Sequence, residues 1–146
     1  SGADDVADSR TWAALDYDQD GWTDIALVNA NAPLLSLYRN TIGEINKSNH
    51  IKVLLVGGAA GKDPGKGLTN RDGVGAVVEV MSGQRLIKRV RNLGEGYAAQ
   101  NSATMTIGIG SEDTVQSVKV RWPSGKITTS RLSVSAGSSI VMKEIQ

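Results

Sequence analysis

The chain has 146 residues, of which 40% are hydrophobic, and it carries a formal net charge of +1 and no cysteine. This length and composition suit one folded domain with at most a small second part, and they exclude a disordered chain. The absence of cysteine excludes disulfides, thiolate metal sites and cysteine nucleophiles. No run of about 18 apolar residues occurs, so the sequence predicts no membrane span.

The net charge conceals two parts of opposite charge. Residues 1–49 hold three basic and eight acidic residues, a net charge of −5, and residues 50–146 hold thirteen basic and seven acidic residues, a net charge of +6. We therefore place a boundary near residues 46–50 and expect the two parts to attract each other. Three segments are predicted: a flexible N-terminal remnant over 1–10, a hairpin unit over 11–48 and a second domain over 49–146.

Short runs rich in Val and Ile follow one another along the chain and are bounded by Gly, Asn, Asp and Pro. These runs predict strands at 12–15, 24–29, 35–39, 51–56, 76–81, 85–92, 104–109, 115–122, 127–130 and 139–143. Turns are expected at Gly83 and at 122–126, where Pro123 and Gly125 suit a type I turn. Segment 57–73 is expected to be a mobile, Gly-rich surface loop without the spacing of a phosphate loop. No segment shows helical periodicity over three turns, so the predicted fold class is all-β.

The segment DYDQDGWTD, residues 16–24, has the spacing of a calcium loop. Gly21 permits a sharp bend after the third acidic position, and a hard cation that takes six to eight oxygens suits this arrangement best. The predicted calcium ligands are Asp16, Asp18, Asp20, Asp24 and the main-chain carbonyl of Trp22. Leu27 stands where an EF-hand has Glu, and the flanks favour strands, so the sequence predicts a loop at the tip of a β-hairpin. A solvated, metal-free turn and a catalytic carboxylate pair are the less favoured interpretations.

A second polar group lies in the segment GEGYAAQNS, residues 94–102. Tyr97, Gln100, Asn101 and Ser102 could line a small-ligand or sugar site, with the Tyr97 ring as the stacking face. The favoured alternative is a polar turn whose amides bind main-chain groups.

Other residues are assigned structural roles. His50 is the only histidine, which excludes a histidine-based triad or a multi-histidine zinc site within one chain. Trp122 is expected in the core, and the arginines of RLIKRVR, residues 85–91, are expected on a solvated edge or a docking face. The low net charge and the missing aromatic interleaving argue against nucleic-acid binding. The tripeptide NKS, residues 46–48, is a formal glycosylation sequon.

Several motifs together resemble a known family. They are DYDQDGWTDIALVN (16–29), LYRN (37–40), NHIKVLLVG (49–57), NRDGVGAVVEV (70–80), GEGYAAQNS (94–102), IGIG (107–110) and VKVRWPSGK (118–126). The chain resembles the C-terminal part of the cartilage acidic protein family, an FG-GAP/VCBS calcium repeat followed by an ASPIC/UnbV domain. The resemblance implies that the calcium hairpin is the remnant of a β-propeller blade, packed on a compact antiparallel sandwich or barrel-like domain.

The resemblance also implies a setting. Members are secreted or surface proteins linked to adhesion, and bacterial members also occur in natural-product gene clusters. One calcium loop is too little for a propeller of at least four blades, so a fragment of a longer protein is the favoured interpretation.

We hypothesise a calcium-binding, non-catalytic adhesion or ligand-binding module of an extracellular, cell-surface or periplasmic protein. Its partners would be the remaining propeller blades, a second chain, a glycan or a matrix protein. Two alternatives stay open: an enzyme or accessory protein of enediyne-type biosynthesis, and a structural cap of a β-propeller.

Overall fold

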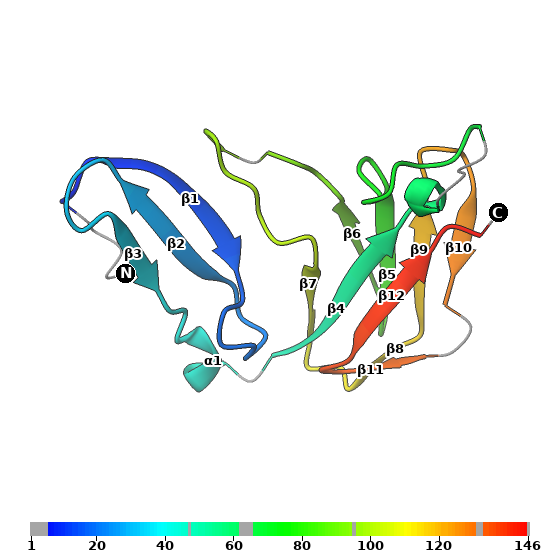
Figure 1. Cartoon of the computed structure of the whole chain (residues 1–146). Coiled ribbons are helices and arrows are strands. Elements are labelled where there is room, and N and C mark those ends of the chain that lie inside the picture. The colour runs from blue at the N-terminus through cyan, green and yellow to red at the C-terminus, as the bar shows by residue number, and fades with distance from the viewer. Residues whose placement is uncertain (1–5, 47, 62–65, 95, 131–132, 146) are drawn as a thin grey trace. The chain divides into compact units, whose positions relative to one another are not determined.

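The computed structural model describes residues 6–46, 48–61, 66–94, 96–130 and 133–145. The chain forms two compact units (Figure 1). Unit 1 comprises Ser1–Lys47 and Leu93–Ser102, and unit 2 comprises Ser48–Asn92 and Ala103–Gln146. Within the described residues, no helix is long and apolar enough to cross a membrane.

Strands dominate both units, as the sequence predicts. The strands are β1 (Ser9–Leu15), β2 (Asp24–Asn29), β3 (Leu35–Tyr38), β4 (Asn49–Val56), β5 (Val77–Ser82), β6 (Arg85–Val90), β7 (Met105–Gly110), β8 (Thr114–Val115), β9 (Ser117–Arg121), β10 (Ile127–Thr129), β11 (Val134–Ser135) and β12 (Ser139–Lys143). One short α-helix, α1 (Ile42–Ile45), and one 3-10 turn, η1 (Gly58–Ala60), complete the described elements.

Unit 1 is an antiparallel sheet in the order β1-β2-β3. Ser9 and Arg10 already belong to β1, so only residues 1–5 of the predicted flexible N-terminus lie outside the described residues. The sheet leaves apolar side chains accessible on both faces: Trp12 and Ile25 on one, Val28 and Leu35 on the other. None of the described hydrophobic side chains of this unit is fully buried.

The segment Leu93–Ser102 belongs to unit 1, although it lies far along the chain. Asn101 Oδ1 accepts a hydrogen bond from the main-chain N–H of Ala14 at 2.8 Å, and the N–H of Ser102 donates to the Ala14 carbonyl at 3.4 Å. Both contacts fall on β1, the edge strand of the sheet, and they occupy main-chain groups that an edge strand otherwise leaves open. The predicted single domain over 49–146 is therefore interrupted by this segment.

Unit 2 is a sandwich of two main sheets, and in Figure 1 β4 and β12 cross in front of β5 and β9. The four-stranded sheet has the order β10-β9-β5-β6 and is antiparallel throughout. The three-stranded sheet has the order β12-β4-β7, in which β4 pairs with β7 antiparallel and with β12 parallel. Within the described residues, the sheets do not close into a barrel, so the sandwich prediction holds and the barrel-like one does not.

The core lies between these sheets. Alternation along β4 turns Ile51, Val53 and Leu55 inward, with exposed fractions of 0–3%. Trp122 is buried as predicted, and its indole N–H donates to Thr128 Oγ1 at 2.9 Å. Val and Ile side chains from facing strands are buried together and give this unit a hydrophobic core, which the described residues of unit 1 do not form.

Most predicted strands match in position, and 24–29 and 139–143 match exactly. The predicted strand 115–122 is divided at Gln116, whose N–H donates to the carbonyl of Met81. The turn at Pro123 forms as expected, since the Gly125 N–H donates to the Trp122 carbonyl at 2.9 Å and Gly125 adopts φ = 88°. The predicted mobility of 57–73 falls partly on residues 62–65, outside the described residues.

Candidate metal centre

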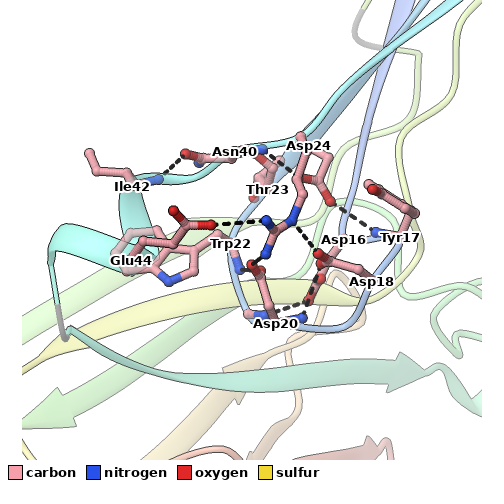
Figure 2. A network of polar contacts seen from close by, with 12 residues as sticks. Asp16, Tyr17, Asp18, Asp20, Trp22, Thr23, Asp24, Asn40, Ile42 and Glu44 are labelled. Carbon is pink, nitrogen blue, oxygen red and sulfur yellow. Dashed lines mark hydrogen bonds and ion pairs between the residues drawn. The ribbon is translucent and has the colours of Figure 1, made fainter.

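The acidic loop joins β1 to β2 at one end of the unit 1 sheet (Figure 2). Two residues in the left-handed region shape it: Gln19 at φ = 61° and Gly21 at φ = 91°. The left-handed conformation favours glycine, which explains Gly21 at this bend. Asp24 is the first residue of β2 and is fully buried.

Three of the predicted carboxylates converge. One carboxylate oxygen each from Asp16, Asp18 and Asp24 lies within 4.8 Å of the other two. Oxygens bound to one calcium ion, each about 2.3–2.6 Å away, are at most about 5 Å apart. The three oxygens therefore fit around a single hard cation, and an all-oxygen donor set suits calcium.

Main-chain N–H groups position all three carboxylates, and Asp18 Oδ1 accepts from Asp20 N at 3.3 Å. Asp24 accepts hydrogen bonds from Tyr17 N at 3.1 Å and from Asn40 N at 2.8 Å, which joins the start of the loop to the segment after β3. Asp16 Oδ2 accepts from Gly21 N at 3.1 Å. Donors from the peptide backbone fix these carboxylates without neutralising their charge.

Asp20 and Trp22 are placed differently. Asp20 is not part of the converging group, and its Oδ1 accepts from Trp22 N at 2.8 Å. The Trp22 indole lies against α1, where a Cβ on Gly43 would overlap the ring. Completing the predicted five-ligand site would require Asp20 to rotate toward the other three carboxylates.

Arg39 is the residue of this centre that the sequence did not single out. Its guanidinium lies 2.7 Å from Asp18 Oδ2, 3.6 Å from Asp20 Oδ2 and 3.0 Å from Glu44 Oε1. The hydrogen bond from Arg39 lowers the pKa of Asp18 below its ordinary value, and the same bond raises the pKa of Arg39. The Arg39 guanidinium thus offsets part of the negative charge of Asp18 and Asp20.

The second predicted ligand site, in residues 94–102, is mostly exposed in its described part. Asn101 faces the main chain of β1, Tyr97 is 80% exposed and Gln100 is exposed. The Asn101 contact is of the kind expected for a polar turn that binds main-chain groups.

Two further predicted residues can be located. The carbonyl of His50 accepts from Gly137 N at 2.7 Å, which joins β4 to the turn before β12. Arg91 was expected on a solvated face or a docking face, but it is buried, with an exposed fraction of 5%. It follows β6, its main-chain N–H donates to the Ala76 carbonyl at 2.9 Å and its guanidinium donates to the Asn92 carbonyl at 2.7 Å.

Two carboxylates of unit 2, Glu79 and Glu144, make contacts that the sequence did not indicate. Glu79 on β5 lies 3.2 Å from Lys88 Nζ and 3.3 Å from Arg121 Nε across neighbouring strands. Glu144 is buried after β12 and accepts hydrogen bonds from Gly58 N, Thr69 N and Thr69 Oγ1, and from Ser124 Oγ. Each joins strands or loops that are distant in sequence, so neither could be recognised from local spacing.

The fold and the loop define an all-β protein with an acidic hairpin suited to a hard cation. A comparison with protein families matches residues 66–146 to the family described as ASPIC and UnbV. Because the match covers more than half of the chain, the protein belongs to the ASPIC and UnbV family. A search of curated proteins finds no match. The family match begins after the aspartate loop, so the FG-GAP/VCBS and cartilage acidic protein resemblances stay predictions.

Proposed function

We propose that the chain is a calcium-binding, non-catalytic module in which the cation stabilises the β1–β2 hairpin. The observation that carries this proposal is the convergence of Asp16, Asp18 and Asp24 oxygens within 4.8 Å. Like charges at this separation repel one another, and a divalent cation would remove that repulsion. A hairpin sheet without a buried apolar side chain among its described residues has much to gain from such a ligand.

The proposed setting is an extracellular, cell-surface or periplasmic protein that works in adhesion or ligand binding. The loop is partly open to solvent, since the side chains of Asp18 and Asp20 are 25% and 28% exposed. Open sites of this kind suit the weak affinities, about 10⁻⁴–10⁻³ M, of extracellular calcium modules. A glycan or matrix protein is the proposed partner class.

A structural role beside neighbouring blades is a second candidate. The specific observation is the unit 1 sheet, which leaves Trp12 and Ile25 accessible on one face and Val28 and Leu35 on the other. A propeller blade is covered on both faces by its neighbours, and an exposed apolar sheet needs such cover.

Calorimetric titration of the chelator-treated protein with calcium tests the proposed function, with melting curves recorded in parallel. We expect one site and, at a hundredfold excess of free calcium over Kd, a stabilisation of about 2.7 kcal/mol. Asp16→Asn should weaken binding strongly. Asp8→Asn, which removes the same charge from the exposed Asp8–Arg10 pair of unit 1, is the matched control. No binding at millimolar calcium, with unchanged melting, would refute the proposal.

A further inference from the structure

The four loop aspartates differ in whether a charged side chain faces them. Asp16 and Asp24 accept hydrogen bonds from main-chain N–H groups, and Asp24 is fully buried. Asp18 and Asp20 face the guanidinium of Arg39, at 2.7 Å and 3.6 Å. Asp18 and Asp20 also accept from the main-chain N–H groups of Asp20 and Trp22. This pair therefore combines main-chain bonds with a charged side-chain partner.

Strand pairing brings Arg39 to the loop. β3 pairs with β2 so that Tyr38 lies opposite Ile25, the residue after Asp24. Arg39 follows Tyr38 and so emerges beside the end of the loop at which Asp24 stands. The next residue, Asn40, donates its main-chain N–H to Asp24 Oδ1 at 2.8 Å, which fixes the backbone directly after Arg39. The register of the sheet thus sets the position of the guanidinium relative to the carboxylates.

A guanidinium and a divalent cation compete for the same oxygens. Asp18 Oδ2 accepts from Arg39 Nε, and Asp18 Oδ1 accepts from Asp20 N at 3.3 Å. A calcium ion placed among Asp16, Asp18 and Asp24 would stand close to the positive charge of Arg39, and the two cations would repel each other. Binding therefore requires that the guanidinium withdraw from Asp18 and Asp20.

Glu44 provides a second partner for the withdrawn guanidinium. Arg39 Nη1 lies 3.0 Å from Glu44 Oε1, and Glu44 stands on α1, outside the acidic loop. Its side chain is 62% exposed, so it can follow the arginine without breaking buried contacts. The same helix lies against the Trp22 indole, which belongs to the loop.

We propose that Arg39 is an internal competitor of the cation, which holds Asp18 and Asp20 in the cation-free loop and keeps only its Glu44 contact when calcium binds. This inference rests on the proposed function and adds regulation to the same site. Arg39 stabilises the loop without calcium and lowers its calcium affinity. Glu44 opposes this effect, because it stabilises the arginine in its withdrawn position.

Calcium titration of Arg39→Gln, Glu44→Gln and the double variant tests the inference. Arg39→Gln should bind calcium about three- to tenfold more tightly, the range expected for losing one partly exposed charge-assisted contact. Without calcium its melting temperature should fall, and saturating calcium should restore it. Arg10→Gln removes the same charge from an exposed ion pair of unit 1 and should leave the Kd unchanged. Glu44→Gln should weaken calcium binding when Arg39 is present. It should not do so in the Arg39→Gln background, because no guanidinium is left for Glu44 to bind.

The outcomes separate the two proposals. If neither the wild-type protein nor Arg39→Gln binds calcium, the proposed function fails and the inference fails with it. If the wild-type protein binds and Arg39→Gln binds no more tightly, the inference alone is overturned. If only Arg39→Gln binds, the competition is supported while the proposed function of the natural chain is refuted.

A measurement on the wild-type protein keeps the test independent of variant folding. The Arg39 Nε–H signal in ¹⁵N NMR should be shifted in the cation-free protein by its bond to Asp18, and calcium should move it. An Arg39 signal that stays unchanged while calcium saturates the site would overturn the inference.

Discussion

Glu144 Oε2 accepts a hydrogen bond from the main-chain N–H of Gly58 at 2.6 Å, although 86 residues separate the two. The same carboxylate accepts from Thr69 N at 2.9 Å and from Ser124 Oγ. One buried side chain thus joins the end of β12, the turn η1, the end of the Gly-rich segment and the turn after β9. All of these bonds lie in unit 2.

Replacement of Glu144 should destabilise unit 2. Glu144→Gln keeps the shape of the side chain but turns one acceptor oxygen into a donor, which faces other donors. We expect a loss of about 1–3 kcal/mol in the free energy of unfolding, because buried N–H groups lose their partner. Urea unfolding at pH 7 measures this loss. Glu112→Gln, the same charge change at a less buried position of unit 2, should cost much less.

Acid should weaken the same contacts. Burial raises the pKa of Glu144, but the hydrogen bonds from Ser124, Gly58 and Thr69 together outweigh it, so the pKa lies below its ordinary 4.5. A carboxylate whose pKa is lower in the folded state than in the unfolded state stabilises the protein at pH values above its unfolded pKa. This stabilisation is lost as the pH falls through the folded pKa. The difference in unfolding free energy between wild type and Glu144→Gln should be constant from pH 7 to about 5.5. It should shrink below pH 4.5. A difference that stays constant down to pH 3 would contradict this account.

Local patterns predicted the strands and the acidic loop because both depend on neighbouring residues. Alternation along β4 follows from the strand period of two. The aspartate spacing predicted that four carboxylates converge, and three of them do, those of Asp16, Asp18 and Asp24. Gly83 and Gly125 adopt the positive φ values, 56° and 88°, that the turn sequences suggested.

Long-range pairing lay beyond local patterns. The place of Arg39 depends on the register between β2 and β3, which no short motif contains. The parallel pairing of β12 with β4 joins the last and the first strand of unit 2. Asn101 reaches Ala14 across 87 residues, so its contact with β1 could not be read from GEGYAAQNS.

Asn101 should act as a structural residue of unit 1. Asn101→Ala removes the acceptor for the Ala14 N–H, and we expect hydrogen exchange at that amide to accelerate. Asn101→Asp keeps an acceptor oxygen and should retain most of the protection. Gln100→Ala changes an exposed neighbour and serves as the control. Equal exchange in Asn101→Ala and wild type would show that the side chain does not cover β1 in solution.

Two glycines of the segment after β4 form a matched pair for the last prediction. Gly57 and Gly61 flank η1 and share φ = −71°, with ψ of 157° and 166°, a conformation open to alanine. A Cβ on Gly57 would overlap the carbonyl oxygen of Asn70 and lie 2.7 Å from that of Thr69, whereas a Cβ on Gly61 would meet nothing within 4 Å. Gly57→Ala should therefore destabilise unit 2 by about 1–3 kcal/mol, because the strand end and residues 69–70 must separate. Gly61→Ala should be neutral or stabilise by up to about 1 kcal/mol, since alanine restricts the unfolded chain. Urea unfolding of both variants measures the contrast, and equal stabilities would show that residues 69–70 do not pack against Gly57.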